Sequence, residues 1–309
     1  MGGTNTAFGV VDAQGRVVAR GSIKTAENNG FDDYVDQLHT AIMRTIDEAG
    51  LADQVGGMGF GAPNANYYTG IIEAGVNLPW PTPIPLADKI SAKFGIPCQV
   101  TNDANAAAVG EMTYGVARGM KDFIMITLGT GVGSGIVVNG KVLYGYDGFA
   151  GELGHVIINR ENGRQCGCGR KGCLETYCSA TGVARTAREF LAQRGDESVL
   201  RGIDADSLTS KDVHDAAVAG DKLSQDVFEF TGKVLGEALA DFTAFSAPEA
   251  FVLFGGLTKS GDFIMNPIKQ SFEQNVLSLW RGKVKILFSA MNEADAAILG
   301  ASALGWQND

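Results

Sequence analysis

The sequence lacks the features of a secreted, membrane-bound or nucleic-acid-binding protein. It contains no cluster of Lys and Arg and has a formal net charge of −10, so it presents no basic surface for DNA, RNA or acidic lipid. No apolar run reaches the roughly 18 residues of a membrane-spanning helix, and no charged-then-apolar leader opens the sequence. We therefore expect a cytoplasmic protein with neither a nucleic-acid nor a membrane partner.

The sequence also lacks the signs of disorder. Charged residues make up only 19% of the 309 residues, and no linker rich in Pro, Ser and Gly, no repeat and no low-complexity tract interrupts the chain. Hydrophobic residues make up 45%, enough for a large core. Glycine is abundant, at 42 residues gathered in short clusters, which is typical of tight turns and of binding sites lined by backbone.

Strand-like and helical patterns alternate along the chain, which indicates an α/β fold. The runs expected to form strands are 7–12 and 16–23, as a hairpin, then 96–101, 122–128, 134–145, 250–254 and 284–289, with a short apolar run at 58–61. Helical spacing covers 31–50, 104–112, most of 175–245, and 293–304. The irregular segment 62–85, rich in Pro, Asn, Gly and Tyr, is predicted to be a binding loop.

One histidine and three cysteines form the most specific motif. His155 precedes Cys166, Cys168 and Cys173, and the glycines between the cysteines let the backbone curl so that the thiolates point inward. Four such ligands make a closed, structural zinc site, whereas a catalytic site keeps one position for water. The alternative is three buried free cysteines near an unrelated histidine. Cys98 and Cys178 are expected to be ordinary buried thiols.

A second motif is Asn102–Asp103, where a predicted strand meets a predicted helix. A carboxylate there can serve as a base, because the positive end of the helix favours its ionised form. The alternative is an ordinary helix cap, since Asn and Asp cap many helices.

Two turns rich in Gly and Thr, at residues 2–6 and 129–133, lie beside predicted strands. Such turns can direct backbone N–H groups and hydroxyls at phosphate oxygens. Neither is a P-loop or a GxGxxG turn followed by a helix. Gly255–Gly256 is a third candidate, suited to a nucleotide base or ribose. The alternative for each of these three segments is an ordinary hairpin turn or strand-to-helix turn.

Two carboxylates, Glu152 and Glu175, flank the cysteine segment. A zinc site would hold both rigidly, and paired carboxylates suit a ligand rich in hydroxyls because each accepts two hydrogen bonds. Two unrelated surface acids are the alternative.

Taken in order, these motifs resemble the ROK family of sugar kinases and repressors, in the actin/hexokinase-like superfamily, and within it the bacterial glucokinases. The resemblance extends from Gly2 to the last predicted helix. The residues that carry it are Gly2–Gly3–Thr4, Gly61–Ala62–Pro63, Asn77–Leu78–Pro79–Trp80, Asn102–Asp103 with the following Ala104–Ala107, Gly129–Gly133, Glu152 with Gly154–His155, Cys166 to Glu175, and Gly255–Gly256.

The resemblance implies a fold of two actin-like, ribonuclease H-like lobes, with hexose and ATP in the cleft between them and a structural zinc loop. It implies that Asp103 is the catalytic base. The implied sugar-binding residues are Gly61, Asn77, Asn102, Asp103, Glu152, His155 and Glu175. The implied ATP-binding residues are Gly3, Thr4, Asn5, Gly129, Thr130, Gly131, Gly255 and Gly256. ATP with Mg²⁺, a structural Zn²⁺, and a homodimer or homotetramer complete the expectation.

The expected reaction is phosphorylation of glucose at its 6-hydroxyl. Fructose, mannose or an N-acetylhexosamine remains an alternative acceptor, and a non-catalytic sugar-sensing regulator is the alternative of another class. The repressors that the family includes carry a helix-turn-helix segment ahead of the first Gly/Thr turn. This sequence is acidic and starts at that turn, so we expect an enzyme.

The resemblance also implies an apolar first strand that ends in an aspartate two residues before Gly2, and the sequence starts at Met1 instead. A chain that begins there is expected to have low stability and much reduced activity. The first lobe is predicted to comprise residues 1–113 and 292–309, and the second, larger lobe residues 114–291.

Overall fold

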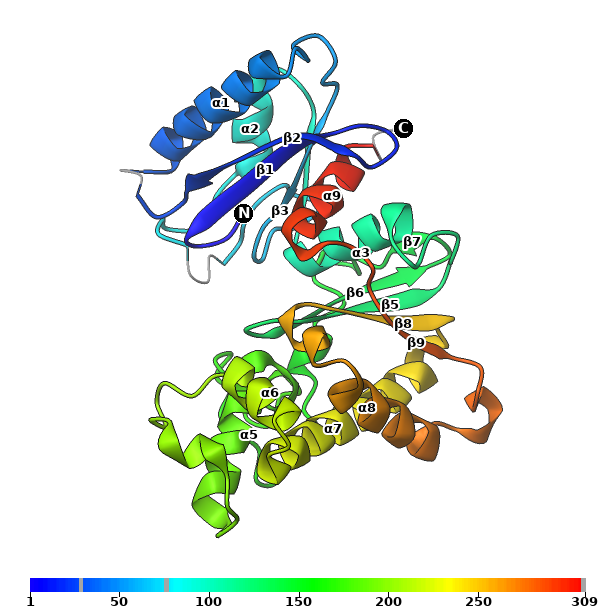
Figure 1. Ribbon diagram of the computed structural model, residues 1–309. Helices are drawn as coiled ribbons and strands as arrows, with labels where there is room; N and C mark the ends of the chain where they lie inside the picture. The colour runs from blue at the N-terminus through cyan, green and yellow to red at the C-terminus, as the bar shows by residue number, and fades with distance from the viewer. Residues whose placement is uncertain (28–29, 75–77, 307–309) are drawn as a thin grey trace. The chain divides into compact units, whose positions relative to one another are not determined.

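The computed structural model describes residues 1–27, 30–74 and 78–306 (Figure 1). By its internal contacts the chain forms two units. The first comprises Met1–Lys121, Gly135–Gly151 and Ser289–Asp309, and the second comprises Asp122–Ser134 and Glu152–Phe288. The predicted limits of independent lobes, at 113 and 292, stay a prediction.

In its described residues, the first unit contains a hairpin, a parallel strand pair, the short strand β7 and four helices. Its elements are β1 (Asn5–Val11), β2 (Val17–Lys24), α1 (Phe31–Glu48), β3 (Met58–Gly61), α2 (Leu86–Phe94), β4 (Cys98–Thr101), α3 (Asp103–Tyr114), β7 (Lys141–Val142) and α9 (Glu293–Gly305). Strand β1 pairs antiparallel with β2, and β3 pairs parallel with β4. The predicted hairpin and the predicted first and last helices are confirmed.

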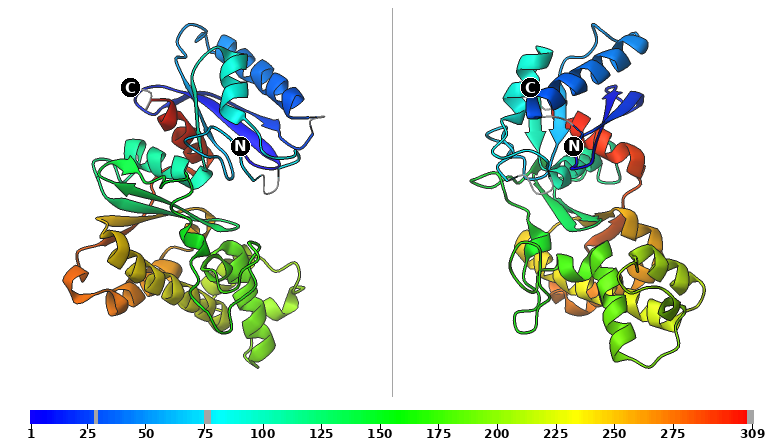
Figure 2. Two further views of the ribbon diagram at one scale, coloured as in Figure 1. Left: turned by 180° about the vertical axis from the view of Figure 1, so that it is seen from behind. Right: turned by 90° about the vertical axis from the view of Figure 1, so that its left-hand side faces the viewer.

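Helices cover both faces of β1 and β3. Phe8 and Val10 of β1 and Phe60 of β3 pack against the cluster that includes Leu38 and Ile42 of α1. On the opposite face, a side chain at Gly9 would meet Ile298 of α9. Both views in Figure 2 show α1 on one side of this hairpin and α9, in red, on the other. Phe60 is therefore buried, whereas Phe8 and Val10 are half-buried although helices lie on both faces of the strands.

The second unit is built on parallel strands and on a group of packed helices. Its elements are β5 (Phe123–Leu128), β6 (Val132–Val138), α4 (Glu175–Cys178), α5 (Ala180–Gln193), α6 (Ser210–Val218), α7 (Lys222–Ser246), β8 (Ala250–Phe254), α8 (Asp262–Asn275), β9 (Lys285–Phe288), and 3₁₀ helices at Leu153–His155, Val199–Gly202, Gly256–Ser260 and Ser278–Trp280. Strand β6 begins in this unit and ends in the first one.

Strands β5, β8 and β9 lie side by side and run parallel, with Phe123 opposite Ala250 and Ala250 opposite Lys285. Strands β5 and β8 consist almost entirely of buried apolar residues, as expected for parallel strands that are covered on both faces. Helices α7 and α8 pack along each other (Figure 1). Among the residues that the structure describes, no helix has both the length and the apolar character that crossing a membrane requires.

Two local expectations were wrong. The run 134–145 is not one strand, because the chain reverses at Asn139 and Gly140, both with positive φ, and β6 then pairs antiparallel with β7. The Asn-Gly pair is itself a strong hairpin signal. Helix α2 was not expected, because four prolines, at positions 79, 81, 83 and 85, lie directly ahead of it. Its end is marked by Gly95, which adopts the left-handed conformation of a helix C-cap.

Candidate functional site

In the first unit, the predicted base lies where β4 meets α3. Asp103 is the first residue of α3, and its carboxylate is exposed. Its Oδ1 accepts a hydrogen bond from the backbone N–H of Ala104 at 2.9 Å. Asn102 is the N-cap, and its Oδ1 accepts from the N–H of Asn105 at 2.6 Å. The cap interpretation therefore holds for Asn102, whose amide N–H₂ remains a donor.

The end of β3 lies against the start of α3. A side-chain carbon at Gly61 would stand 3.1 Å from Cβ of Ala106 and 3.5 Å from Cα of Asp103, so a larger residue would push strand and helix apart. The carbonyl of Gly61 accepts a hydrogen bond from the Met1 ammonium at 2.6 Å. Burial lowers the pKa of that ammonium, and the negative charge of Asp103 partly opposes the shift.

The first Gly/Thr turn lies beside the same residues. The N–H of Gly2 donates to the carbonyl of Asn5 at 3.0 Å, which closes the turn that contains Gly3 and Thr4. Asn5 and Asp103 line one cavity. Asn77, predicted to contact the sugar, lies outside the described residues.

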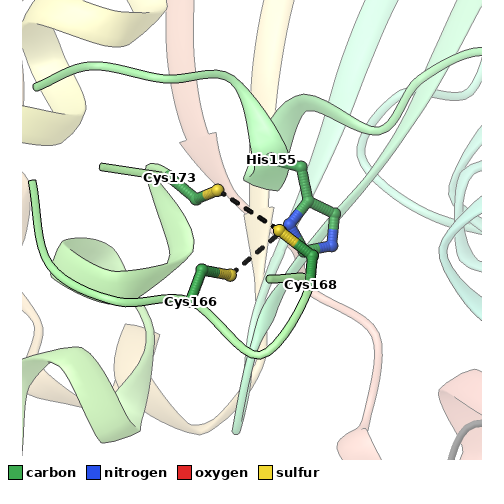
Figure 3. A group of neighbouring side chains, drawn as sticks. All are labelled: His155, Cys166, Cys168 and Cys173. Atoms are coloured by element: carbon green, nitrogen blue, oxygen red, sulfur yellow. Dashed lines mark hydrogen bonds between the residues drawn. The ribbon is translucent and has the colours of Figure 1, made fainter. Parts of the chain in front are cut away.

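In the second unit, His155, Cys166, Cys168 and Cys173 turn toward one another (Figure 3). Their ligand atoms all lie within 4.8 Å of one another. The Sγ atoms of Cys168 and Cys173 are 3.6 Å apart, and Sγ of Cys166 is 3.8 Å from Nδ1 of His155.

These separations fit tetrahedral zinc. With zinc–sulfur distances of about 2.3 Å, two thiolates on one tetrahedral ion lie about 3.8 Å apart. Three sulfurs and one imidazole nitrogen make a closed set of four, so the fit is to a structural ion. Because Nδ1 of His155 faces the thiols, its Nε2 remains available for another hydrogen bond.

The thiols of this cluster differ in acidity. Burial raises the pKa of the Cys166 thiol to about 12. Burial also works upward on the pKa of Cys168, but hydrogen bonds from Arg170, Cys166 and Cys173 outweigh it and lower that pKa to about 6. The cluster thus favours one thiolate before any metal arrives, and a bound zinc ion would hold all three cysteines deprotonated.

Backbone bonds and one buried arginine close the cysteine loop, defined as residues 155–175. The N–H of Leu174 donates to Val156, and that of Ile158 to Gly172, so the two ends of the loop run together. Arg164 lies under the loop with its side chain only 7% exposed. Its guanidinium donates to the carbonyl of Thr176, to the hydroxyl of Thr186 and to the carboxylate of Glu189. It also stacks on the ring of Tyr177.

Nothing in the sequence pattern indicated Arg164, because a lone arginine among polar residues is typical of a surface. Its role becomes visible only when α4 and α5 surround it in the folded chain.

Glu175 connects the cysteine loop to the second Gly/Thr turn. Its Oε2 accepts from the N–H of Val132 at 3.0 Å, and its Oε1 lies 3.7 Å from Sγ of Cys166. A side chain at Gly131 would stand 2.2 Å from the same carboxylate, so a larger residue there would displace Glu175 from this contact. On the other side of the turn, Thr181 of α5 donates to the carbonyl of Thr130. The structure thus joins the predicted phosphate turn, the cysteine loop and Glu175.

The remaining predicted residues border this region. Glu152 is exposed and immediately precedes the 3₁₀ helix that carries His155. Gly255 follows β8 and packs on the end of β5, where a side chain would stand 2.6 Å from the carbonyl of Leu128. Because β5 and β8 are parallel neighbours, the turns at Gly129 and at Gly255–Gly256 leave the same edge of the sheet. Ligands of open α/β sheets commonly bind outside the carboxyl ends of such strands.

The fold and these motifs together indicate one protein family. The sequence model of the ROK family matches residues 1–308, so the chain belongs to the ROK family. Among its relatives, a glucokinase of Halalkalibacterium halodurans is 36% identical over 310 residues, which cover 99% of this chain and 92% of the relative. The predicted family and the α/β fold are thereby confirmed.

Solved structures of the family match over nearly the whole chain. A ROK glucokinase of Streptomyces griseus, in complex with glucose and AMPPNP, is 32% identical with a TM-score of 0.80, and the match covers 100% of this chain and 98% of that one. A ROK transcriptional regulator, a homologue of the Escherichia coli MLC protein, is 27% identical with a TM-score of 0.85. That match covers 98% of this chain and 76% of the regulator. Kinases and regulators of the family thus share this fold.

Proposed function

We propose that the chain transfers the γ-phosphate of ATP to the 6-hydroxyl of a hexose, and that glucose is the preferred acceptor. The observation that carries the proposal is the exposed carboxylate of Asp103 at the start of α3, next to the end of β3. The glucokinases among the relatives, one of them with glucose and an ATP analogue bound, support the same reaction.

The first unit supplies the base in this proposal. The Asp103 carboxylate accepts the proton of the 6-hydroxyl while that oxygen attacks the γ-phosphorus, and ADP leaves with the bridging oxygen. Asn102, Gly61 and Asn77 hold the sugar. Gly3, Thr4 and Asn5 contact ATP phosphates, and Mg²⁺, when bound, neutralises phosphate charge.

The second unit supplies the remaining contacts. Glu152, His155 through Nε2, and Glu175 receive the hydroxyls at the anomeric end of the sugar. His155, Cys166, Cys168 and Cys173 would hold a zinc ion, which would serve as a structural crosslink that fixes the imidazole. Gly129, Thr130 and Gly131 hold phosphate, and Gly255–Gly256 lies near the adenosine. A cytoplasmic homodimer or homotetramer remains part of the proposal.

A panel of hexoses tests the acceptor. Paired carboxylates and an imidazole suit a sugar with free anomeric and 2-hydroxyl groups, so ATP-dependent turnover is expected to be fastest with glucose. Fructose, mannose and N-acetylmannosamine are the comparison substrates. Equal or faster turnover of N-acetylmannosamine would contradict the glucose assignment and leave the kinase assignment intact.

Asp103→Asn tests the base. The amide cannot accept the proton, so kcat is expected to fall by about 10²- to 10⁴-fold while glucose binding, measured by calorimetry, changes little. The matched control is Asp88→Asn, because Asp88 is also an exposed aspartate in the first turn of a helix. A variant that loses sugar binding but keeps its turnover per bound sugar would overturn the assignment.

A sugar-sensing regulator is the second candidate, because the regulator above has the same fold with a higher TM-score than the kinase. This second candidate function predicts that the chain binds hexose but does not phosphorylate it with ATP. Measurable phosphorylation of any hexose by the purified chain would exclude a purely sensory role.

A further inference from the structure

Helix α1 places one tyrosine between two predicted binding segments of the first unit. Tyr34 is fully buried in the apolar cluster of that unit, although it carries a polar hydroxyl. We infer that Tyr34 is a positioning residue: its hydroxyl holds the predicted ATP turn, residues 2–6, and its ring holds the end of the predicted sugar-binding motif, at Trp80. The inference rests on the proposed function, which assigns these two segments to ATP and to hexose.

Three buried hydroxyls form a chain that begins at Tyr34. The Tyr34 hydroxyl is hydrogen-bonded to Oγ1 of Thr6 at 2.9 Å, and Oγ1 of Thr6 is hydrogen-bonded to Oγ1 of Thr25 at 2.9 Å. All three side chains belong to residues that are at most 2% exposed. A buried hydroxyl without a partner is costly, and these hydrogen bonds offset that cost. Burial also raises the pKa of Tyr34, so its hydroxyl stays protonated near neutral pH.

This chain of hydroxyls holds the first Gly/Thr turn at two points. Thr6 directly follows Asn5, whose carbonyl closes the turn. Thr25 reaches the turn a second time, because its N–H donates to the carbonyl of Thr4 at 2.9 Å. Tyr34 holds the Thr6 hydroxyl from a separate element, α1. The turn is therefore held both by backbone pairing and by side chains that come from two directions.

The ring of Tyr34 packs against the other predicted segment. Its centroid lies 4.8 Å from that of Trp80, and the ring of Phe31 packs on both, at 5.8 Å from Tyr34 and 5.3 Å from Trp80. Trp80 is 7% exposed, and its indole N–H has no hydrogen-bond partner within the described part of the chain. Ring packing, rather than a hydrogen bond of the indole, thus holds Trp80 among these residues. Trp80 closes the motif in which Asn77, three residues earlier, is predicted to bind the sugar.

Packing alone does not account for a tyrosine at this position. The neighbouring buried residues of α1 are apolar, namely Val35, Leu38 and Ile42. Phenylalanine would fill nearly the same volume and would bring no hydroxyl that needs a partner. Tyrosine adds one contact, the hydrogen bond to Thr6, and the ring and the hydroxyl of this one residue can be removed separately.

Removal of the hydroxyl tests the ATP end. Tyr34→Phe keeps the ring and breaks the bond to Thr6. The affinity for AMP-PNP with Mg²⁺, measured by calorimetry, is expected to fall about three- to tenfold, which corresponds to one neutral hydrogen bond. The affinity for glucose is expected to stay within about twofold of wild type. Thr25→Val removes the other end of the hydroxyl chain and is expected to lower AMP-PNP affinity in the same direction.

A change of Trp80 tests the sugar end. Trp80→Leu removes the aromatic contact and leaves the hydroxyl chain intact, so glucose affinity is expected to fall about three- to tenfold while AMP-PNP affinity is retained. Trp80→Phe restores a ring and is expected to recover part of the glucose affinity. If Trp80→Leu does not fold, as judged by thermal unfolding, Trp80→Phe must itself show the smaller glucose loss.

The control for lost stability is Ile42→Val, which deletes one buried methyl group from the same helix. Its affinities for both ligands are expected to equal those of wild type, with a Tm lowered about as much as in Tyr34→Phe. Loss of either affinity in this variant would show that binding follows the stability of α1, which would overturn the inference.

Unchanged AMP-PNP affinity in Tyr34→Phe would also overturn the inference, and so would wild-type glucose affinity in the variants of Trp80. Equal losses of both affinities in Tyr34→Phe would reduce Tyr34 to a general structural role. Turnover is a separate readout. A wild-type chain that binds both ligands without phosphorylating glucose would contradict the proposed reaction, and the binding data would still decide the role of Tyr34. A wild-type chain that binds neither ligand would contradict both.

Discussion

The start of α3 and the cysteine loop both hold predicted functional groups, but by different physical means. The α3 region relies on close backbone approach. A side-chain carbon at Gly61 would stand 3.1 Å from Cβ of Ala106, and one at Gly300 of α9 would stand 2.6 Å from the carbonyl of Ala106. The cysteine loop has little regular structure and relies on side chains, namely the four candidate zinc ligands and the buried Arg164. Small residues in the α3 region let the backbones approach closely and so hold Asp103 in place. The cysteine loop is held instead by contacts between its side chains.

The largest effect is expected from removing a zinc ligand. A structural zinc ion contributes about 10–16 kcal/mol of apparent binding free energy in small domains, and loss of one of four ligands forfeits much of it. Cys166→Ser is therefore expected to lower zinc content from about one ion per chain to near zero. Faster amide exchange should appear across residues 155–175 and leave α3 unchanged.

Cys98→Ser is the control for that variant, since Cys98 is a partly buried thiol of β4 and lies outside the cluster. Zinc content is measured by emission spectroscopy after dialysis. A stable and active wild-type protein without zinc would contradict the metal site.

A smaller effect is expected from Arg164→Met. The substitution leaves the carbonyl of Thr176 without its partner, and an unsatisfied buried group costs about 1–3 kcal/mol. Arg185→Met is the matched control, because Arg185 also pairs with Glu189, at 3.0 Å, but its side chain is 39% exposed. Exposed pairs contribute about 0–1 kcal/mol. Equal losses of unfolding free energy in urea for the two variants would show that burial of Arg164 is unimportant.

The smallest substitution, which adds a single carbon atom, tests the α3 region. Gly300→Ala adds one carbon, which would overlap the backbone of α3, and overpacking of this kind costs about 1–3 kcal/mol. Gly30→Ala is the control, since among the described residues, its chain neighbours aside, no atom lies within 4 Å of a side-chain carbon there. Faster exchange in α3 and α9 with unchanged zinc content is expected. Zinc loss in this variant would show that the two regions are not independent.

In both regions the sequence predicted the candidate functional residues, but it did not predict the buried side chain that supports the cysteine loop. Cys-x-Cys and a third cysteine five residues later form a local pattern, so the four candidate zinc ligands could be predicted from the sequence, and the structure brings them together. The Asn102–Asp103 junction was equally evident, because a strand and a helix meet there. Arg164 was not, since its partners Thr186 and Glu189 lie 22 and 25 residues along the chain.

The same limit applies to the fold. Hydrophobic periodicity predicted the β1–β2 hairpin, α1 and α9, because each depends on neighbours in the sequence. Whether β1 pairs with β3 depends on residues about 50 positions apart in the sequence. The hydrogen bond between Met1 and Gly61 likewise joins residues that are 60 positions apart. Periodicity contains no information about which strands meet.

The proximity of Cys168 and Cys173 has a consequence for handling the protein. Their sulfurs are 3.6 Å apart, and a disulfide bond requires about 2.05 Å, so a small movement brings them together. Oxidation would convert two of the four ligands into one covalent bond and leave only His155 and Cys166. An air-oxidised preparation should therefore be metal-poor, and a reductant added before zinc should restore the metal.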